Sequence, residues 1–298
     1  MEIHYLTKKS FSNLLINNPY ISKVHCLDNN LNVIMDDLMA ENFDYIIDLH
    51  KNIRTFRVKM KLKKPSFTFN KLNVEKWLLV KFKINILPKI HIVDRYFNAV
   101  KMLGVVNDNK GLDYFIDEKD KVNTLHENYS KGFVAIVTGG KHNTKQIPEN
   151  ILISICDKTK YPIILLGGKE DYDKSELVRT KSTNKDIINA CGSYNINQSA
   201  SIISQADKVI TGDTGLMHIA AAFNKEIISL WGNTVPDFGM YPYLPKGDEN
   251  KSLIMQVEGL SCRPCSKLGY DKCPVKHFNC MNKINIDTII NTINTNND

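Results

Sequence analysis

The chain of 298 residues has no run of apolar residues long enough to span a lipid bilayer. Its first residues, MEIHYLTKKSF, also lack the apolar core of a secretory signal peptide. We therefore expect neither a transmembrane helix nor a signal peptide in this sequence, and we expect a cytoplasmic protein. With 43% apolar and 24% charged residues, the composition is that of an ordinary globular protein, long enough for two domains with real cores.

Acidic residues are nearly absent from residues 51–89. Twelve Lys and Arg residues accompany a single acid there, Glu75, so the segment carries +11 and leaves about −4 for the rest of a chain of net charge +7. Aromatic residues, including Trp77 and Phe82, are interleaved with these charges. A basic surface with aromatic side chains suits anionic lipid head groups or nucleic acid, and a solvated helical face is the simpler alternative. We expect the segment on one face of the first domain.

Short apolar strands alternate with helix-prone segments, which is typical of parallel α/β sheets. The expected strands are 3–6, 23–27, 43–49, 133–138, 161–166 and 187–190, and the expected helices are 10–16, 32–40, a basic helix after Thr55, 94–103 and 284–293. The polar stretch 117–131 is the predicted linker. The predicted division is therefore a first domain at 1–125, a second at 126–283, and a C-terminal helix and tail at 284–298.

Residues 207–231 are the most informative part of the chain. A β-prone run is broken at Gly212, an Ala-rich helix follows, and a second β-prone run ends at Trp231. Asp213 or Thr214 can cap this helix, and Gly215 lets a ligand approach the backbone. The N–H groups of the first turn and the helix dipole favour an anion, which His218, one turn further on, can also reach. The segment predicts a phosphate or diphosphate site at the carboxyl edge of a parallel sheet.

Two other interpretations of this segment exist. Asp-Thr-Gly is also the signature of aspartic proteases, but these need an all-β setting and a second copy, whereas here a helix follows and the motif occurs once. A purely structural cap explains any one of these residues, but it explains less well why Asp, Thr, Gly and His fall within six positions.

Residues 213–222, DTGLMHIAAA, followed by 229–234, SLWGNT, resemble the signature of the family nine glycosyltransferases, the bacterial heptosyltransferases of lipopolysaccharide core assembly. The resemblance implies an α/β fold of GT-B type, in which two Rossmann-like domains face a cleft. It also implies an ADP-heptose-type donor held by the second domain, and inverting transfer that needs no catalytic metal or other cofactor. In GT-B proteins the terminal helix often crosses back to the first domain.

The resemblance covers nearly the whole chain. FDYIIDLHKNIRT and HIVDRYFNAVKMLGV are similar to first-domain segments of the family, and TGG with KQIP is similar to its donor-phosphate segment, although the family usually has Trp where Ile147 stands. LLGGKE resembles the strand whose Glu contacts the donor nucleoside. The implied donor-binding residues are Thr138, Lys145, Glu170, Asp213, Thr214, Gly215 and His218.

The beginning of the chain departs from the family pattern. Family members usually open with a strand and a Gly-Asp loop whose Asp is the candidate general base, whereas residues 1–7 resemble the second strand. We therefore expect a first domain that is incomplete at its N-terminus, with weak or no transfer and persisting nucleotide binding. The catalytic base is not identified. Asp48 and His50 end a strand near the expected cleft and are candidate substitutes, although Asp48 can equally cap the next helix.

Seven cysteines divide into two groups. Cys26, Cys156 and Cys191 lie in or beside apolar runs and are expected to be buried thiols. Four others fall within nineteen residues with the spacing C-x2-C-x7-C-x6-C, near His277; they are Cys262, Cys265, Cys273 and Cys280. A structural zinc site, a disulfide pair and plain thiols remain open for this group.

Three functions are compatible with these features. The first is an inverting glycosyltransferase that moves a heptose-type sugar from an ADP-sugar to a lipopolysaccharide core or similar glycan. Its acceptor would be an anionic lipid-linked glycan, met at the inner face of the cytoplasmic membrane. The second is a non-catalytic or degenerate nucleotide-sugar-binding protein. The third, nucleic-acid binding, explains the basic segment but leaves the motif at Asp213 without a role, so a nucleic-acid partner is not expected.

Overall fold

The computed structural model describes residues 1–28, 30–123, 129–130 and 132–295. Contacts divide the chain into two units, Met1–Asn73 with Ile90–Asp108 and Val74–Lys89 with Asn109–Asp298. The predicted domain boundary between residues 125 and 126, and part of the predicted linker 117–131, lie outside the described residues. The predicted domain limits therefore stay predictions.

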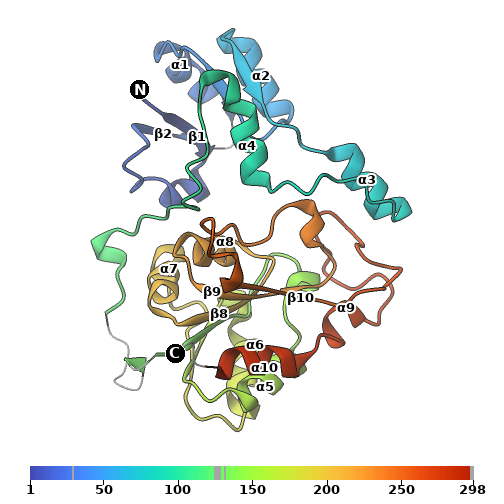
Figure 1. The fold of residues 1–298 in the computed structure, drawn as a ribbon. Helices are drawn as coiled ribbons and strands as arrows, with labels where there is room; N and C mark the ends of the chain where they lie inside the picture. The colour runs from blue at the N-terminus through green and yellow to red at the C-terminus, as the bar shows by residue number, and fades with distance from the viewer. Residues whose placement is uncertain (29, 124–128, 131, 296–298) are drawn as a thin grey trace. The chain divides into compact units, whose positions relative to one another are not determined.

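The second unit is built on a six-stranded sheet whose neighbouring strands are all parallel (Figure 1). The strand order is β10-β9-β8-β5-β6-β7. The strands are β5 (Val134–Val137), β6 (Ile163–Leu166), β7 (Ile187–Asn189), β8 (Lys208–Gly212), β9 (Glu226–Trp231) and β10 (Ser252–Gln256). The sequence predicted all of these except β10, which follows a long loop and has only one sheet neighbour.

Helices cover both faces of this sheet. One face carries α5 (Glu149–Lys158), α6 (Tyr172–Lys181) and α10 (Ile286–Asn294), and the other carries α7 (Ile196–Gln205) and α8 (Gly215–Ala222). Strand residues alternate between the two cores: Val134 and Ile136 pack with α5, whereas Ala135 and Val137 pack with α7 and α8. A strand that is buried on both faces appears in the sequence as a continuous run of apolar residues. Such runs made most strands of this sheet predictable from the sequence.

The C-terminal helix α10 packs on the second unit. Ile289 and Ile293 are fully buried in the core that includes α5, and Asp287 forms an ion pair of 2.9 Å with Lys158. The Lys208 ammonium donates to the carbonyl of Thr292 at 2.8 Å. The C-terminal helix therefore belongs to the second unit.

Residues 74–89 join the second unit, although they lie between segments of the first. Helix α3 (Asn73–Phe82) and the chain after it bring Leu79, Val80 and Leu87 against Val235 and Phe238. The basic segment 51–89 is therefore divided between the two units, and the expectation that it forms one face of the first is wrong. The apolar side of α3 decides this packing, and a count of charges does not reveal it.

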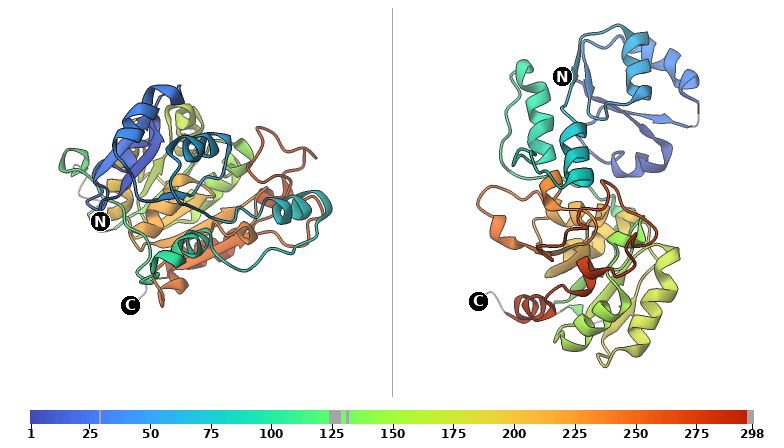
Figure 2. Two further views of the ribbon diagram at one scale, coloured as in Figure 1. Left: turned by 90° about the horizontal axis from the view of Figure 1, so that it is seen from above. Right: turned by 90° about the vertical axis from the view of Figure 1, so that its right-hand side faces the viewer.

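The first unit contains two pairs of parallel strands, β1 (His4–Lys8) with β2 (Lys23–Leu27) and β3 (Ile46–Asp48) with β4 (Ser66–Thr68) (Figure 2). Its helices are α1 (Leu31–Ala40), α2 (Ile53–Leu62) and α4 (Ile92–Val100), and its core includes Leu27, Ile34, Met35, Leu38 and Val58. The sequence missed β4, which interrupts the single basic helix expected after Thr55. Cys26 is exposed, because side chains alternate along β2 and only its neighbours face the core.

The remaining elements are short. They are α9 (Asn279–Asn282) and the 3₁₀ helices η1 (Lys9–Leu14), η2 (Lys101–Leu103), η3 (Glu118–Asp120), η5 (Asn143–Lys145), η6 (Lys169–Asp171), η7 (Pro236–Phe238) and η8 (Glu249–Lys251). Element η1 stands where an α-helix was expected at 10–16. None of the helices in the described ranges has the length and apolar character that a membrane span requires.

Candidate functional site

The predicted donor-site residues follow three adjacent strands of the second unit. In the sheet, β5 lies between β8 and β6, so the chain order reverses between β5 and β8. Ligands of open parallel sheets bind at such a reversal, outside the carboxyl ends of the strands. Lys145 lies in the loop after β5, Asp213 and Gly215 after β8, and Glu170 after β6. The topology therefore places these residues at one edge of one sheet.

Lys145 and Asp213 form an ion pair at this edge. The Lys145 Nζ lies 2.7 Å from Asp213 Oδ2, and their side chains are 16% and 9% exposed. The hydroxyl of Thr234 donates to the same carboxylate oxygen at 2.9 Å. These contacts neutralise Asp213, which would otherwise repel an anion, and they hold the ammonium of Lys145 beside the start of α8.

The first turn of α8 is open to a ligand. Thr214 is the N-cap residue, but its side chain makes no capping hydrogen bond, and its hydroxyl lies 3.1 Å from that of Thr211 instead. The first N–H groups of a helix have no partner within the helix. A Cβ added to Gly215 would meet no atom of the described structure within 4 Å. This helix start therefore offers backbone donors and room, as an anion site requires.

His218 belongs to the same group. Burial lowers the pKa of its imidazole, and the positive charge of Lys145 lowers it further, whereas Asp213 opposes both. The side chain is half-buried. The structure thus brings His218 within electrostatic range of both members of the ion pair, on the helix that Gly215 begins.

Two glycines allow the loop after β5 to cross the ends of the neighbouring strands. A Cβ on Gly212 would collide with the carbonyl oxygen of Lys145, and a Cβ on Gly232 would lie 2.7 Å from the carbonyl oxygen of Thr144. Real Cβ atoms do not come so close to backbone atoms. Both positions therefore require glycine, and this close approach is what carries Lys145 over to Asp213.

Thr138 and Glu170 make different contacts from the other predicted residues. The Thr138 hydroxyl is fully buried and lies 2.8 Å from the hydroxyl of Ser175 and 3.3 Å from the thiol of Cys191. These contacts give Thr138 a packing role between the end of β5, helix α6 and the residues after β7. Glu170 is exposed, and its carboxylate occupies the space beside Gly168 where a side chain would otherwise stand. A nucleoside-binding role for either residue stays a prediction.

The Cys-rich segment supports the site loops. Arg263 donates to the carbonyls of Gly232 and Thr234 at 2.6 and 3.0 Å, and the N–H of Cys265 donates to the carbonyl of Asn233 at 3.1 Å. Tyr270 and Thr144 are also joined by hydrogen bonds. The Tyr270 N–H donates to Thr144 Oγ1, and the hydroxyl and the N–H of Thr144 both donate to the Tyr270 carbonyl. The segment therefore holds the loops on which Lys145 and Thr234 lie.

The four clustered thiols do not form a compact metal site in the described residues. All seven cysteines are free, and Cys262, Cys265, Cys273 and Cys280 are not among the groups of three or more side chains whose ligand atoms lie within 4.8 Å of one another. Burial, followed by the neighbouring Cys265, raises the pKa of Cys280 to about 11. The structure therefore gives no support to the predicted zinc site.

Sequence reasoning missed several residues at this edge. Thr234 holds Asp213, Arg263 holds the loop of Thr234, and Gln146 donates to the carbonyl of Gly140 and to Asp171 at 2.9 and 3.3 Å. The amide of Asn233 is 1% exposed and has no hydrogen-bond partner within the described chain. Asn233 and Thr234 lie in the quoted SLWGNT motif, so that motif was the available signal for both.

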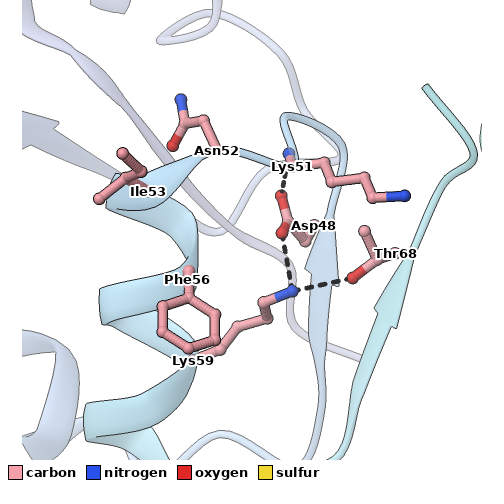
Figure 3. A pocket seen from close by; sticks show the side chains of 7 residues that line it. All are labelled: Asp48, Lys51, Asn52, Ile53, Phe56, Lys59 and Thr68. Carbon is pink, nitrogen blue, oxygen red and sulfur yellow. Dashed lines mark hydrogen bonds and ion pairs between the residues drawn. The ribbon is translucent and has the colours of Figure 1, made fainter. Parts of the chain in front are cut away.

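The first unit has an open pocket of its own, with a volume of about 540 Å³ (Figure 3). It lies where β3 and β4 end and α2 begins. Its lining combines two lysines with apolar and polar side chains: Asp48, Lys51, Asn52, Ile53, Phe56, Lys59 and Thr68. Ile53 and Phe56 are 79% and 59% exposed. The pocket can therefore receive a ligand that has both anionic and apolar parts.

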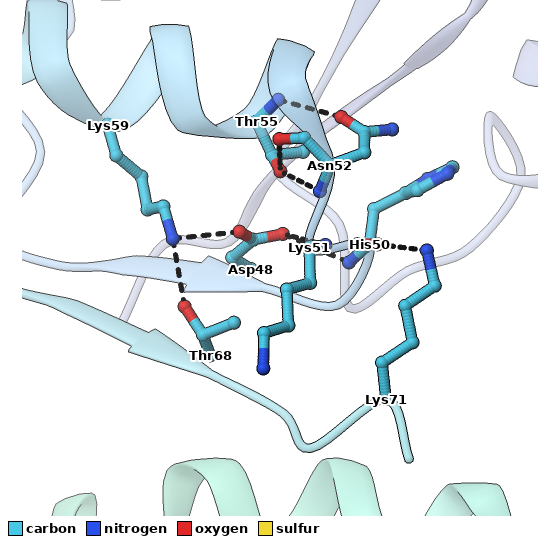
Figure 4. Close-up of polar contacts among 8 residues, drawn as sticks. All are labelled: Asp48, His50, Lys51, Asn52, Thr55, Lys59, Thr68 and Lys71. Atoms are coloured by element: carbon cyan, nitrogen blue, oxygen red, sulfur yellow. Dashed lines mark hydrogen bonds and ion pairs between the residues drawn. The ribbon is translucent and has the colours of Figure 1, made fainter. Parts of the chain in front are cut away.

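Asp48 is fully engaged in this pocket. Its Oδ1 accepts from the N–H groups of His50 and Lys51 at 3.0 and 2.7 Å, and its Oδ2 lies 2.9 Å from the ammonium of Lys59 (Figure 4). Burial would raise the pKa of Asp48, but hydrogen bonds from Lys51, Lys59 and His50 outweigh it and hold the pKa below its ordinary value. These contacts order the turn before α2 and oppose proton abstraction.

His50 and Asn52 complete the turn. The His50 ring is exposed, and its carbonyl accepts from the ammonium of Lys71 at 2.9 Å. Asn52 is the N-cap of α2 and forms a capping box with Thr55. Asp48 therefore stabilises the turn that leads into the helix, and Asn52 supplies the cap itself.

Comparison with known proteins agrees with this architecture. Residues 33–267 match the family model described as glycosyltransferase family 9 (heptosyltransferase). The structure is similar to that of the ADP-heptose heptosyltransferase II of E. coli, with a TM-score of 0.68 and 16% identity over 98% of this chain and 88% of that one. It is also similar to an E. coli heptosyltransferase determined with ADP-2-deoxy-2-fluoro heptose, with a TM-score of 0.62 and 17% identity over 87% and 84% of the two chains.

Curated sequences give the same result. A lipopolysaccharide heptosyltransferase 1 from Campylobacter coli is 24% identical over 259 residues, 78% of this chain and 76% of that protein. A lipooligosaccharide heptosyltransferase 2 from Haemophilus influenzae is 32% identical over 102 residues, a stretch that spans 33% of this chain and only 28% of that relative. The fold is that of the GT-B glycosyltransferases, as predicted. The chain belongs to glycosyltransferase family 9.

Proposed function

We propose that the chain transfers a heptose-type sugar from an ADP-sugar donor to a lipid-linked glycan of the lipopolysaccharide core type, with inversion at the anomeric carbon. The observation that carries the proposal is the Lys145–Asp213 ion pair beside the open start of α8, at the reversal of strand order. Family membership and the similarity to a heptosyltransferase determined with a fluorinated ADP-heptose support the choice of donor.

The donor diphosphate would lie on the first turn of α8. Its charge is met there by the N–H groups after Thr214, by the ammonium of Lys145 and by the imidazole of His218. Negative charge develops on the leaving diphosphate as the bond between the anomeric carbon and the phosphate oxygen breaks. Preorganised donors stabilise that charge better than water does. Lys145 and the helix start thus act on the leaving group, and the buried amide of Asn233 offers further hydrogen bonds at the same edge.

An acceptor hydroxyl would attack the anomeric carbon from the opposite side and lose its proton to a base. The base is unassigned. Asp48, whose pKa is held low by its hydrogen-bond partners, is poorly suited to take up a proton, and the exposed His50 is the better of the two predicted candidates. The first-unit pocket, with Lys51 and Lys59 beside Ile53 and Phe56, suits an anionic acceptor that also carries apolar groups.

The membrane contact proposed for the chain rests on exposed apolar residues among the basic ones. On and after α3, five large apolar side chains are at least half exposed: Val74 65%, Trp77 51%, Phe82 54%, Ile84 53% and Ile86 57%. The Trp77 and Phe82 rings pack edge to face at 5.2 Å. Aromatic and apolar side chains beside lysines are the features of a peripheral contact with anionic lipid. We accordingly place the protein at the inner face of the cytoplasmic membrane.

The decisive experiment combines calorimetry with ADP and a transfer assay with ADP-heptose and a lipid A-type acceptor. Binding together with transfer supports the glycosyltransferase. Binding without transfer supports the alternative, a non-catalytic nucleotide-sugar-binding protein. Absence of ADP binding to the folded protein would reject the donor site itself.

A further inference from the structure

Three side chains from separate elements of the first unit meet with their ligand atoms close together. His4 lies on β1, His25 on β2, and Glu41 directly after α1. The His4 Nδ1 lies 3.1 Å from the His25 Nε2, and the Glu41 carboxylate oxygens lie 3.8 Å from the former and 3.9 Å from the latter. Among the described residues, this is the one group of three or more His, Cys, Asp or Glu side chains with ligand atoms mutually within 4.8 Å.

The fold brings this group together by regular pairing. The parallel register opposes His4 to Lys23 and Leu6 to His25, so the two histidines lie diagonally across adjacent strands. Helix α1 follows β2 and returns the chain to place Glu41 beside them. Phe43 packs its ring edge-on against both imidazoles, with centroids 5.3 and 6.2 Å away. His25 is 5% exposed, so its imidazole is held in a packed setting.

We propose that His4, His25 and Glu41 bind one divalent transition-metal ion, of which Zn²⁺ is the best fit. A tetrahedral Zn²⁺ with bonds of about 2.0–2.2 Å spaces its ligand atoms by roughly 3.3–3.6 Å. The two separations from the His4 Nδ1, 3.1 Å to the His25 Nε2 and 3.8 Å to the Glu41 Oε2, lie on either side of this value, so small side-chain rotations suffice to form the site. Two imidazoles and a carboxylate also suit Co²⁺ and Ni²⁺, and they leave a fourth position for water.

The neighbouring charges fit a bound cation. Lys23 pairs with Oε1 of Glu41, whereas Oε2 is the oxygen that faces the His4 Nδ1. The ion would take Oε2 and leave Lys23 on Oε1. The hydrogen that now lies between the two facing nitrogens would move to the other nitrogen of its own ring, because both facing nitrogens must offer lone pairs to the ion. The other ring nitrogen of His4 lies 3.9 Å from the Glu2 carboxylate, where an outer carboxylate commonly orients a metal-bound imidazole.

The role of this site would be structural. The ion would join β1, β2 and the end of α1, in a unit whose sheets have only two strands each. The residues that carry the proposed donor site belong to the second unit, so this inference does not depend on the proposed function. Zn²⁺ should therefore raise the thermal midpoint of the first unit without being required for ADP binding.

The test is a titration of the whole chain with CoCl₂, after removal of metals and under reducing conditions. Cys262→Ser with Cys273→Ser provides the background, because it removes two of the four clustered thiolates that would compete for the ion. We expect one Co²⁺ per chain with visible d–d absorption, no thiolate charge-transfer band, and displacement by ZnCl₂. His25→Gln or His4→Gln should weaken binding by more than about 100-fold, beyond the loss typical of an outer-shell residue.

His50→Gln is the matched control, since it removes an exposed histidine of the same unit and should leave the titration unchanged. If His25→Gln does not fold, His4→Gln and Glu41→Gln, both at less buried positions, carry the test. Two results are possible against the proposal: the Cys-substituted chain binds no Co²⁺, or it binds Co²⁺ equally well after His4→Gln. In both cases the two histidines would serve packing alone. Either result overturns the proposal.

Discussion

Lys145 and Asp213, which follow two neighbouring strands of one parallel sheet, are joined by an ion pair of 2.7 Å. In the free protein Asp213 therefore holds the ammonium that the donor diphosphate is proposed to use. Binding would place a second anion on Lys145 and leave Asp213 with the hydroxyl of Thr234. Asp213 is in this sense a positioning residue, and the anion is met by Lys145 and the helix start.

Lys145→Ala should lower the affinity for ADP by at least about tenfold, because a charge-assisted hydrogen bond to a phosphate contributes about 1.5–3 kcal/mol. Calorimetric titration with ADP measures the loss. Lys141→Ala is the matched control, since Lys141 is exposed in the same loop and should bind ADP normally. Equal affinities for the two variants would show that Lys145 does not contact the nucleotide.

Gly215→Ala should separate stability from binding. A Cβ at this position meets nothing and alanine favours a helix, so thermal stability should be kept or slightly raised, whereas the methyl group would obstruct a phosphate on the first turn. Gly212→Ala should instead destabilise the fold by about 1–3 kcal/mol, because its methyl group collides with the Lys145 backbone. Thermal melts and ADP titrations on both variants measure this. Unchanged ADP affinity in Gly215→Ala would place the phosphate elsewhere.

Stability should fall in acid partly through His218. Burial lowers its pKa below that of the unfolded chain, so the unfolded state binds the proton more readily. The contribution is therefore fully present above the unfolded pKa of about 6.5 and is lost as the pH falls through that value toward the folded pKa. Urea midpoints at pH 7.5 and 5.5 should differ less in His218→Gln than in the parent chain or in His142→Gln. Identical differences in all three proteins would contradict the prediction.

Trp77→Ala with Phe82→Ala should weaken binding to vesicles that contain anionic lipid. The two rings are half exposed near the exposed Lys81, so they can enter the interface while its ammonium meets the head groups. Co-sedimentation should rise with the anionic fraction and fall with salt. The variant keeps Lys76 and Lys81, so a loss of binding would be due to the missing aromatic rings and not to a change in charge. If co-sedimentation of the parent chain changes neither with the anionic lipid fraction nor with salt, the proposed membrane contact is wrong.

Lys59→Met should destabilise the first unit by on the order of 3 kcal/mol, because it leaves the buried carboxylate of Asp48 without its ion-pair partner. Denaturant unfolding measures the change. Lys61→Met, at an exposed position of the same helix, should cost little. Adding Asp48→Asn to Lys59→Met should recover part of the loss, and a strictly additive double variant would show that the two side chains do not interact.

Local sequence was sufficient for most strands of the second unit and for the turn at Asp213. Strands buried on both faces are continuous apolar runs, and Gly212 and Gly215 interrupt the pattern where the chain turns. The same local reasoning missed β10, and it merged α2, β4 and α3 into one basic helix. Short strands with a single neighbour depend on pairing with distant residues, and a local pattern contains little of that information.

The sequence by itself determined that strand, turn and helix follow one another around Asp213, because turn glycines and helix propensity act over a few residues. It also determined the excess of positive charge in residues 51–89. Only the tertiary structure decided that Lys145 reaches Asp213, because this requires β5 to lie beside β8 and glycines to let the loop cross the strand ends. The tertiary structure likewise divided the basic segment between two units, paired Asp48 with Lys59, and assembled His4, His25 and Glu41. Each of these outcomes depends on which distant segments pack together, and that is a property of the whole chain.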